Sequence, residues 1–177
     1  MFEGSIVSAA GPDLTATQLH DLLRLRVDIF VVEQNCPYPE IDGRDLASDT
    51  THLWITGADA TANSAAQGSQ SQTGDAPVAA AIRILSDETE KRIGRVVTHV
   101  DHRGAGLSST LMEAALALVG SHRIVLDAQA HLVEFYARFG FEADGPEFLE
   151  DGIPHVTMRR QSTDTPGAAS PTEEVSP

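Results

Sequence analysis

The chain has 177 residues, of which 41% are hydrophobic, so it is long enough for one domain with a substantial core. Its formal net charge of −14 argues against nucleic acid as its main partner, because phosphate binding depends on clustered Lys and Arg. No stretch approaches the roughly 18 apolar residues of a membrane-spanning helix, and the N-terminus lacks the pattern of a signal peptide. A single cysteine, Cys36, excludes an internal disulfide and is typical of a reducing compartment, so we expect a cytoplasmic protein without a membrane partner. The excess of acid either keeps the protein soluble or, in part, lines a pocket for a cationic substrate.

Two segments are too small and polar to pack into a core. Residues 57–77 hold no large apolar side chain and are predicted to be a flexible insertion in a hairpin. Residues 161–177 have the same character and are predicted to be a disordered tail. The predicted domain is therefore residues 1–160, interrupted by that insertion.

The predicted secondary structure alternates helices with strands. A first helix begins near the capping residues Asp13, Thr15 and Thr17 and frays or ends in the β-branched stretch 27–32. Strands at 51–57 and 77–85 flank the insertion as an antiparallel hairpin, and a third strand covers 91–100. A helix from Leu107, a strand at 123–129, a short helix at 131–139 and a last strand at 152–160 follow. This order indicates a mixed α/β (α+β) domain.

The segment RGAGLSST, residues 103–110, places two glycines directly before a well-patterned helix. The first N–H groups of a helix have no intrahelical partner and attract anions, and glycine lets the backbone approach a phosphate closely. Arg103 can add a charged fork and the hydroxyls can add donors. The segment is neither a P-loop nor a dinucleotide fingerprint, because the lysine of the first and the third glycine of the second are absent. On these residues alone, an anion site and an ordinary strand-to-helix turn are equally open.

The sequence resembles the Gcn5-related N-acetyltransferase (GNAT) family in the order of its segments. These are a strand, the segment RGAGLS, a helix, another strand and the segment FYARFGF. The acetyl-CoA loop of that family reads Arg/Gln-x-x-Gly-x-Gly/Ala; Arg103 and Gly106 match it, and Ser108 stands where Gly or Ala is usual. Residues 22–46, 93–97, 128–141 and 148–158 resemble more narrowly the ElaA-type branch. The resemblance implies the GNAT fold, a central and mostly antiparallel sheet flanked by helices, with a strand, the phosphate loop and a helix forming the acetyl-CoA site.

The resemblance also implies an acetyl-CoA-dependent N-acetyltransferase that acylates a primary amine directly. The strand end would pair its backbone with the pantetheine arm and polarise the thioester, and the loop would hold the pyrophosphate. Tyr136 would be the acid that protonates the departing thiolate. The implied cofactor-binding residues are Val96, Val97, Thr98, Arg103, Gly104, Ala105, Gly106, Leu107, Ser108, Ser109 and, less firmly matched to the family, Gln129.

The general base and the acceptor contacts are open to several interpretations. Glu33 follows an apolar run, so we expect its pKa to be raised and its carboxylate to act as the base, unless it pairs with an arginine. His131 and His155 are alternative bases or substrate contacts, unless they are structural. Loop 37–45 is expected at the acceptor pocket, with Glu40, Asp42 and Asp45 as substrate contacts, or else as a solvated turn. No metal site is predicted, because the candidate ligands near His99 lack further spaced partners.

Two other functions stay open at the level of sequence. One is a protein that senses acetyl-CoA and regulates a partner without turnover, and the other is a module that binds nucleotide phosphates. The expected partners are acetyl-CoA and an amine, without nucleic acid or metal. Family members often dimerise, so the resemblance also allows a homodimer.

Overall fold

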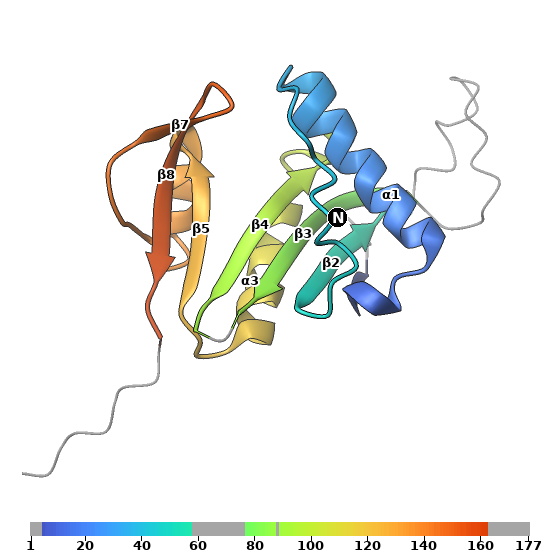
Figure 1. Ribbon diagram of the computed structural model, residues 1–177, viewed down its shortest axis with the longest axis horizontal. Helices are drawn as coiled ribbons and strands as arrows, with labels where there is room; N and C mark the ends of the chain where they lie inside the picture. The colour runs from blue at the N-terminus through green and yellow to red at the C-terminus, as the bar shows by residue number, and fades with distance from the viewer. Residues whose placement is uncertain (1–4, 58–76, 88, 163–177) are drawn as a thin grey trace, which may run out of the picture.

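The computed structural model describes residues 5–57, 77–87 and 89–162, and these residues form one sheet with helices on both faces (Figure 1). Apart from residues 57, 77, 161 and 162, the predicted insertion and the predicted tail lie outside the described part of the chain. The strand order is β1 (Ile6–Ala10), β2 (Thr50–Thr56), β3 (Val78–Ser86), β4 (Lys91–Thr98), β5 (Ile124–Gln129), β8 (Ile153–Arg160) and β6 (Glu142–Ala143), and β7 (Phe148–Glu150) also pairs with β8.

The pairing of the strands confirms the predicted fold class. Every neighbouring pair is antiparallel except β4 with β5, which are parallel. The hairpin of β2 and β3 is present as predicted. Strand β1 was not among the predicted strands, because small residues such as Ala9 and Ala10 give it a weak pattern. Its pairing along β2 makes it a strand.

The first helix changes its hydrogen bonding halfway along. Helix α1 (Ala16–Arg26) begins with a reciprocal cap, in which the Gln18 N–H donates to the Thr15 hydroxyl and the Thr15 N–H donates to the Gln18 side chain. After Arg26 the chain continues as the π-helix η2 (Val27–Glu33). The α-helix therefore ends where β-branched residues begin, as expected, but the chain stays helical instead of fraying.

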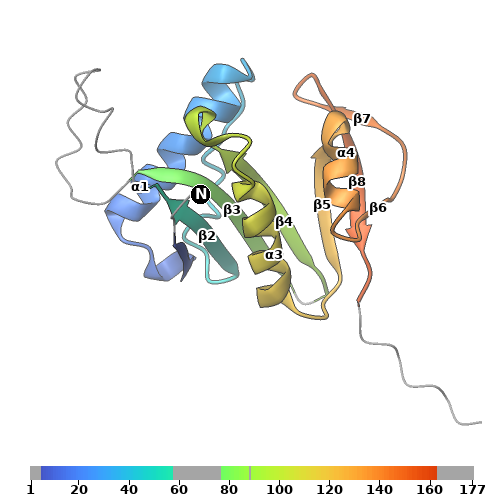
Figure 2. The same cartoon turned by 180° about the vertical axis from the view of Figure 1, so that it is seen from behind.

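Both faces of the sheet are covered, which explains why β3 is apolar almost throughout. Helix α1 packs on one face, and α3 (Leu107–Val119) and α4 (Val133–Ala137) pack on the other (Figure 2). From Val78 to Leu85 every residue of β3 is buried, as expected for a strand with helices on both sides. Arg83 is the one charged residue in that run, so it needs a buried partner. No helix in the described ranges is long and apolar enough to cross a membrane.

Strands β4 and β5 diverge after a short contact. Their parallel ladder has two residue pairs, Lys91 with Ile124 and Arg92 with Val125, and the strands then separate (Figure 1). On its other side, β4 carries a β-bulge, because Ile82 of β3 lies opposite both Arg95 and Val96. The short 3₁₀ turns η1 (Gly11–Asp13), η4 (Val100–His102) and η5 (Ala130–Leu132) link the larger elements.

Candidate active site

A cleft of about 410 Å³ lies where β4 and β5 diverge. The predicted site residues that line it are Asp42, Val96, Gln129, Tyr136 and His155. The predicted residues outside its lining are Glu33, Glu40, Asp45, Val97, Thr98, His131 and the loop from Arg103 to Ser109. Among the described residues, no three His, Cys, Asp or Glu side chains are grouped as a metal site.

Tyr136 enters the cleft from α4 with its ring held in the core. Its side chain packs edge-on against Phe135 and Phe141, with ring centroids 5.0 and 6.3 Å away, and the residue is 6% exposed. Burial raises the pKa of Tyr136 to about 12, so the hydroxyl is protonated at neutral pH. That hydroxyl has no hydrogen-bond partner among the described residues, so its proton is free to be donated to a ligand in the cleft.

The glycine loop connects the end of β4 to the start of α3 through η4. Gly104 and Gly106 have φ values of +78° and +80°, a left-handed conformation that favours glycine. A Cβ at either position would meet nothing within 4 Å, so open space lies beside this backbone. The Thr98 hydroxyl lies 2.7 Å from the Ser108 hydroxyl and joins the strand end to the first turn of the helix. The predicted strand, glycine loop and helix are therefore present in the expected order.

Glu33 does not lie in an apolar surrounding. It is the last residue of the π-helix, and its side chain is 42% exposed. The Arg103 guanidinium donates to both Glu33 carboxylate oxygens at 2.8 Å. The arginine pairing that the sequence left open is thus present, and it joins the end of η2 to the glycine loop.

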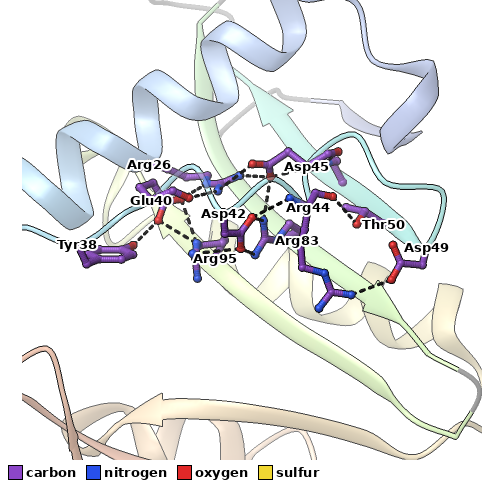
Figure 3. Close-up of polar contacts among 11 residues, drawn as sticks. Arg26, Tyr38, Glu40, Asp42, Arg44, Asp45, Asp49, Thr50, Arg83 and Arg95 are labelled. Carbon is purple, nitrogen blue, oxygen red and sulfur yellow. Dashed lines mark hydrogen bonds and ion pairs between the residues drawn. The ribbon is translucent and has the colours of Figure 1, made fainter.

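The acids of loop 37–45 belong to a cluster of charges (Figure 3). We name this the arginine–carboxylate cluster; its members are Arg26, Glu40, Asp42, Asp45, Arg83 and Arg95. The side chains of Glu40 and Asp45 are only 2% and 6% exposed. In this arrangement Glu40 and Asp45 face arginines and lie outside the cleft lining, whereas Asp42 lines the cleft, and the roles of all three as substrate contacts stay predictions.

The inner part of the cluster is fully paired. Arg26 donates to Glu40 and, at 2.6 Å, to Asp45. Arg83 donates to Asp45 at 3.0 Å and to both carboxylate oxygens of Asp42 at 2.9 and 2.6 Å. Removing one partner of such a pair would leave a buried charge uncompensated, which costs about 3–5 kcal/mol.

The arginines set the ionisation of these acids. Hydrogen bonds from Arg83 hold the pKa of Asp42 well below its usual range. Burial alone would raise the pKa of Asp45, but Arg26 and Arg83 outweigh burial and lower it. Beside them, burial lowers the pKa of His52, so its ring is neutral and its Nε2 donates to the Asp45 carbonyl oxygen at 2.9 Å.

Sequence reasoning missed the three arginines of the cluster. Each stands among apolar residues, in LLRLRV, AAIRIL and RIGRVV, although the first and third segments also hold Arg24 and Arg92. An arginine buried among apolar residues requires a carboxylate partner. Arginines within apolar segments were therefore the sequence signal that could have predicted a buried cluster of charges. The acid-rich loop 37–45 supplied those partners, which the sequence had assigned to a substrate.

His155 and Gln129 lie opposite each other on β8 and β5 at the wide end of the cleft. The His155 Nδ1 lies 2.8 Å from the Ile153 carbonyl oxygen, so Nδ1 carries the proton and Nε2 carries the lone pair, and Nε2 lies 4.0 Å from the Glu150 carboxylate. The Gln129 side chain donates to Gln34 at 3.2 Å, which joins the loop after η2 to β5. His131 is exposed in η5 and outside the cleft lining.

Cys36 also lines the cleft and donates its thiol to the Asp151 carbonyl oxygen at 3.5 Å. Burial raises the pKa of this thiol, and the carboxylates of Asp151 and Glu150 raise it further. The sulfur is therefore held as a thiol, which is a poor nucleophile. This agrees with direct transfer without a covalent cysteine intermediate.

Comparison with known proteins identifies the family of this chain. Residues 56–162 match the model of the acetyltransferase (GNAT) domain. A UPF0039 protein of Mycobacterium tuberculosis is 47% identical over 152 residues, 84% of this chain and 87% of its own length. The ElaA protein of Escherichia coli is 38% identical over 157 residues, 84% of this chain and 91% of its own length.

Solved structures agree with the sequence relatives. An acyl-CoA N-acyltransferase from Pseudomonas aeruginosa, 39% identical, superposes with a TM-score of 0.74 over 89% of this chain and 99% of its own. The crystal structure of Escherichia coli ElaA, 33% identical in that superposition, has a TM-score of 0.76 over 90% of this chain and 100% of its own. The chain therefore belongs to the Gcn5-related N-acetyltransferase (GNAT) family, in its ElaA-type branch, and is an N-acetyltransferase.

Proposed function

We propose that this protein transfers the acetyl group of acetyl-CoA directly to a primary amine bound in the same cleft. The observation that carries the proposal is the unpartnered and protonated Tyr136 hydroxyl in the lining of the cleft between β4 and β5. A buried phenol with a raised pKa is a suitable proton donor for a thiolate leaving group. The sensor alternative requires no such acid.

The donor is proposed to bind along β4 and the glycine loop. The backbone of Val96, Val97 and Thr98 would hold the pantetheine arm and the thioester carbonyl. The N–H groups from Gly104 to Ser109 would bind the pyrophosphate, because the left-handed glycines leave the backbone open to an anion. Arg103 would exchange Glu33 for a phosphate oxygen when the donor binds.

The proposed reaction begins with attack of the neutral amine on the thioester carbon. The new N–C bond forms, and the carbonyl oxygen takes up negative charge that backbone N–H groups of β4 stabilise. The C–S bond then breaks, and the CoA sulfur takes the Tyr136 proton. The nitrogen loses its extra proton to a base, and an amide and free CoA leave the site. A proton from the base or from solvent then restores the Tyr136 hydroxyl.

We propose His155 as that base, with Glu33 as the alternative. His155 lines the cleft, its Nδ1 is hydrogen-bonded so that Nε2 carries the lone pair, and the Glu150 carboxylate 4.0 Å from Nε2 would favour the protonated ring. Glu33 is engaged by Arg103 outside the cleft lining, and it would be released only when Arg103 turns to the phosphate. A His155→Gln variant that loses the acidic limb of the pH–rate profile supports His155, and the same loss in Glu33→Gln alone supports Glu33.

The acceptor is proposed to be a cationic amine that approaches Asp42. This carboxylate lines the cleft and stays ionised, and because both of its oxygens already accept from Arg83, an ammonium group would use their remaining lone pairs. Glu40 and Asp45 are proposed to act indirectly, by holding the arginines of the cluster. His131 is proposed as an outer contact for a longer acceptor.

The proposal is tested by mass-spectrometric detection of acetylated amines and free CoA across a panel of polyamines, aminoglycosides, amino acids and peptides. Detecting the product by mass avoids a background from the Cys36 thiol. Formation of amide and CoA in equal amounts supports the proposal. Tight binding of acetyl-CoA without any amide would contradict it and would favour the sensor, whereas a preference for ATP or NAD over CoA would favour a nucleotide-binding module.

A further inference from the structure

The bulge in β4 has a backbone conformation that its sequence disfavours. Among the described residues, Asn35, Arg95 and Asp151 are the non-glycine residues with positive φ. Asn and Asp adopt the left-handed region fairly often, but a long side chain such as arginine does so rarely. Arg95 has φ +53° in the middle of a central strand, so its surroundings must hold it there.

The side chain of Arg95 is held from three directions. Its Nε lies 3.0 and 2.9 Å from the two Glu40 carboxylate oxygens, and its Nη2 lies 3.6 Å from Asp42. Its guanidinium lies 5.5 Å from the centre of the Tyr38 ring, and the Tyr38 hydroxyl donates to Glu40. Arg95 is therefore fastened to loop 37–45 and not to its own sheet (Figure 3).

This attachment is anchored in the core. Glu40 also accepts from Arg26 of α1, whose side chain is 2% exposed, and if Glu40 moved this buried arginine would keep only Asp45 as its carboxylate partner. Arg95 and Asp42 form the outer end of the cluster, which is partly exposed. Their side chains are 24% and 28% exposed, and both residues line the cleft. The cluster thus forms a rigid connection from the first helix to the bulge.

We propose that the contacts of Arg95 with Glu40, Asp42 and Tyr38 position the bulge of β4 for catalysis, by holding residue 95 in the left-handed conformation. A bulge leaves backbone groups outside the ladder, and Arg95 and Val96 both line the cleft. The inference rests on the proposed function, in which the backbone from Val96 onward holds the thioester. In this role Arg95 is a positioning residue, and its charge does not bind the acceptor.

The test is a series of substitutions at position 95 that separates backbone conformation from charge. Arg95→Gly and Arg95→Asn lose the charge but tolerate a positive φ, whereas Arg95→Ala loses the charge and disfavours it. Arg95→Lys keeps the charge but disfavours the conformation. We expect kcat to be about tenfold higher in the Gly and Asn variants than in the Ala variant, which corresponds to the left-handed penalty of a residue with a Cβ. KM for acetyl-CoA and for the amine should change little.

A different ranking of the four Arg95 variants by activity would overturn the proposal. Suppose that Arg95→Lys is active while the other three variants, Arg95→Gly, Arg95→Asn and Arg95→Ala, share a raised KM for the amine. Arg95 would then bind the acceptor by its charge. If all four variants melt earlier but keep the same kcat at a temperature where they are folded, then the contacts are only structural. If Arg95→Ala fails to fold, Arg95→Asn is compared with Arg95→Lys. A higher kcat in Arg95→Asn supports the conformational role, and a higher kcat in Arg95→Lys supports a role of the charge.

Failure of the proposed function would be recognised separately, as absence of turnover by the unaltered protein with every amine. The conformational requirement would then be read from melting temperature. The Gly and Asn variants should melt about 2–4 °C above Ala, as expected for a conformational penalty of this size in a chain of this length. Equal melting temperatures, or Ala as the most stable, would overturn the inference in that case.

Discussion

At the scale of single residues, Tyr136 is the position on which the proposed chemistry depends most. Its ring belongs to the core, and its hydroxyl reaches the cleft without a partner among the described residues. Because the proton moves only as the C–S bond breaks, Tyr136→Phe should lower kcat by about 10²-fold while the affinity for acetyl-CoA changes little. Steady-state kinetics with the best amine of the panel, together with calorimetry for acetyl-CoA, would measure both quantities.

The control for this substitution is the stability of the fold. The phenyl ring keeps its edge contacts with Phe135 and Phe141, so the melting temperature should hold. Normal turnover in a stable Tyr136→Phe variant would mean that another group or water protonates the thiolate, and the proposed role would be wrong. The motif FYARFGF allowed this residue to be predicted from sequence, because the resemblance to the family assigns the leaving-group acid to the tyrosine of that motif.

At the scale of elements, the two glycines that flank α3 allow strain to be separated from phosphate binding. Gly106 and Gly120 have φ values of +80° and +66°, and a Cβ at either would meet nothing within 4 Å. Alanine at Gly106, where ψ is 8°, costs the left-handed strain of about 1–2 kcal/mol, and at Gly120, where ψ is −132°, it costs more because that region is open mainly to glycine. Only Gly106 lies at the proposed phosphate site.

We expect Gly106→Ala to weaken binding of CoA at least about tenfold, because it disturbs N–H groups that donate to a charged phosphate. Gly120→Ala should leave that affinity unchanged although it should lower the melting temperature at least as much. Equal affinities for CoA in the two variants, measured by calorimetry, would remove the loop from the site. Gly120→Ala serves as the control because a side chain at Gly106, where φ is positive, would lower stability as well as disturb the binding of CoA.

At the scale of the whole molecule, the arginine–carboxylate cluster makes stability depend on pH. The lowered pKa values of Asp42 and Asp45 mean that their contribution to the free energy of unfolding is complete above about pH 4 and is lost as pH falls through the folded-state values. The lowered pKa of the buried His52 adds an earlier loss that begins below about pH 6.5. Melting temperature should therefore fall in two stages on acidification.

The first stage can be assigned with one variant. His52→Gln keeps a donor near the Asp45 carbonyl but cannot titrate, so its melting temperature should change less than that of the unaltered protein between pH 6.5 and pH 5. A profile with the same slope in both proteins would show that other groups cause the early loss. The expected homodimer and the cytoplasmic location stay predictions at this scale.

The sequence by itself determined the features that depend on near neighbours in the chain. The Thr15 cap, the end of the α-helix at Arg26, the hairpin of β2 and β3 and the glycine loop before α3 are all local, and each was predictable from residue type and spacing. The family resemblance added the position of Tyr136.

Only the tertiary structure decided which charges pair and where β4 bends. Glu40 and Asp45 look like surface acids in the sequence, but they are buried because Arg26 and Arg83, from α1 and β3, converge on them. The left-handed Arg95 and the divergence of β4 from β5 depend on contacts between segments far apart in the chain. Propensity and periodicity describe only neighbouring residues, so they carry no information about such contacts until the chain has folded.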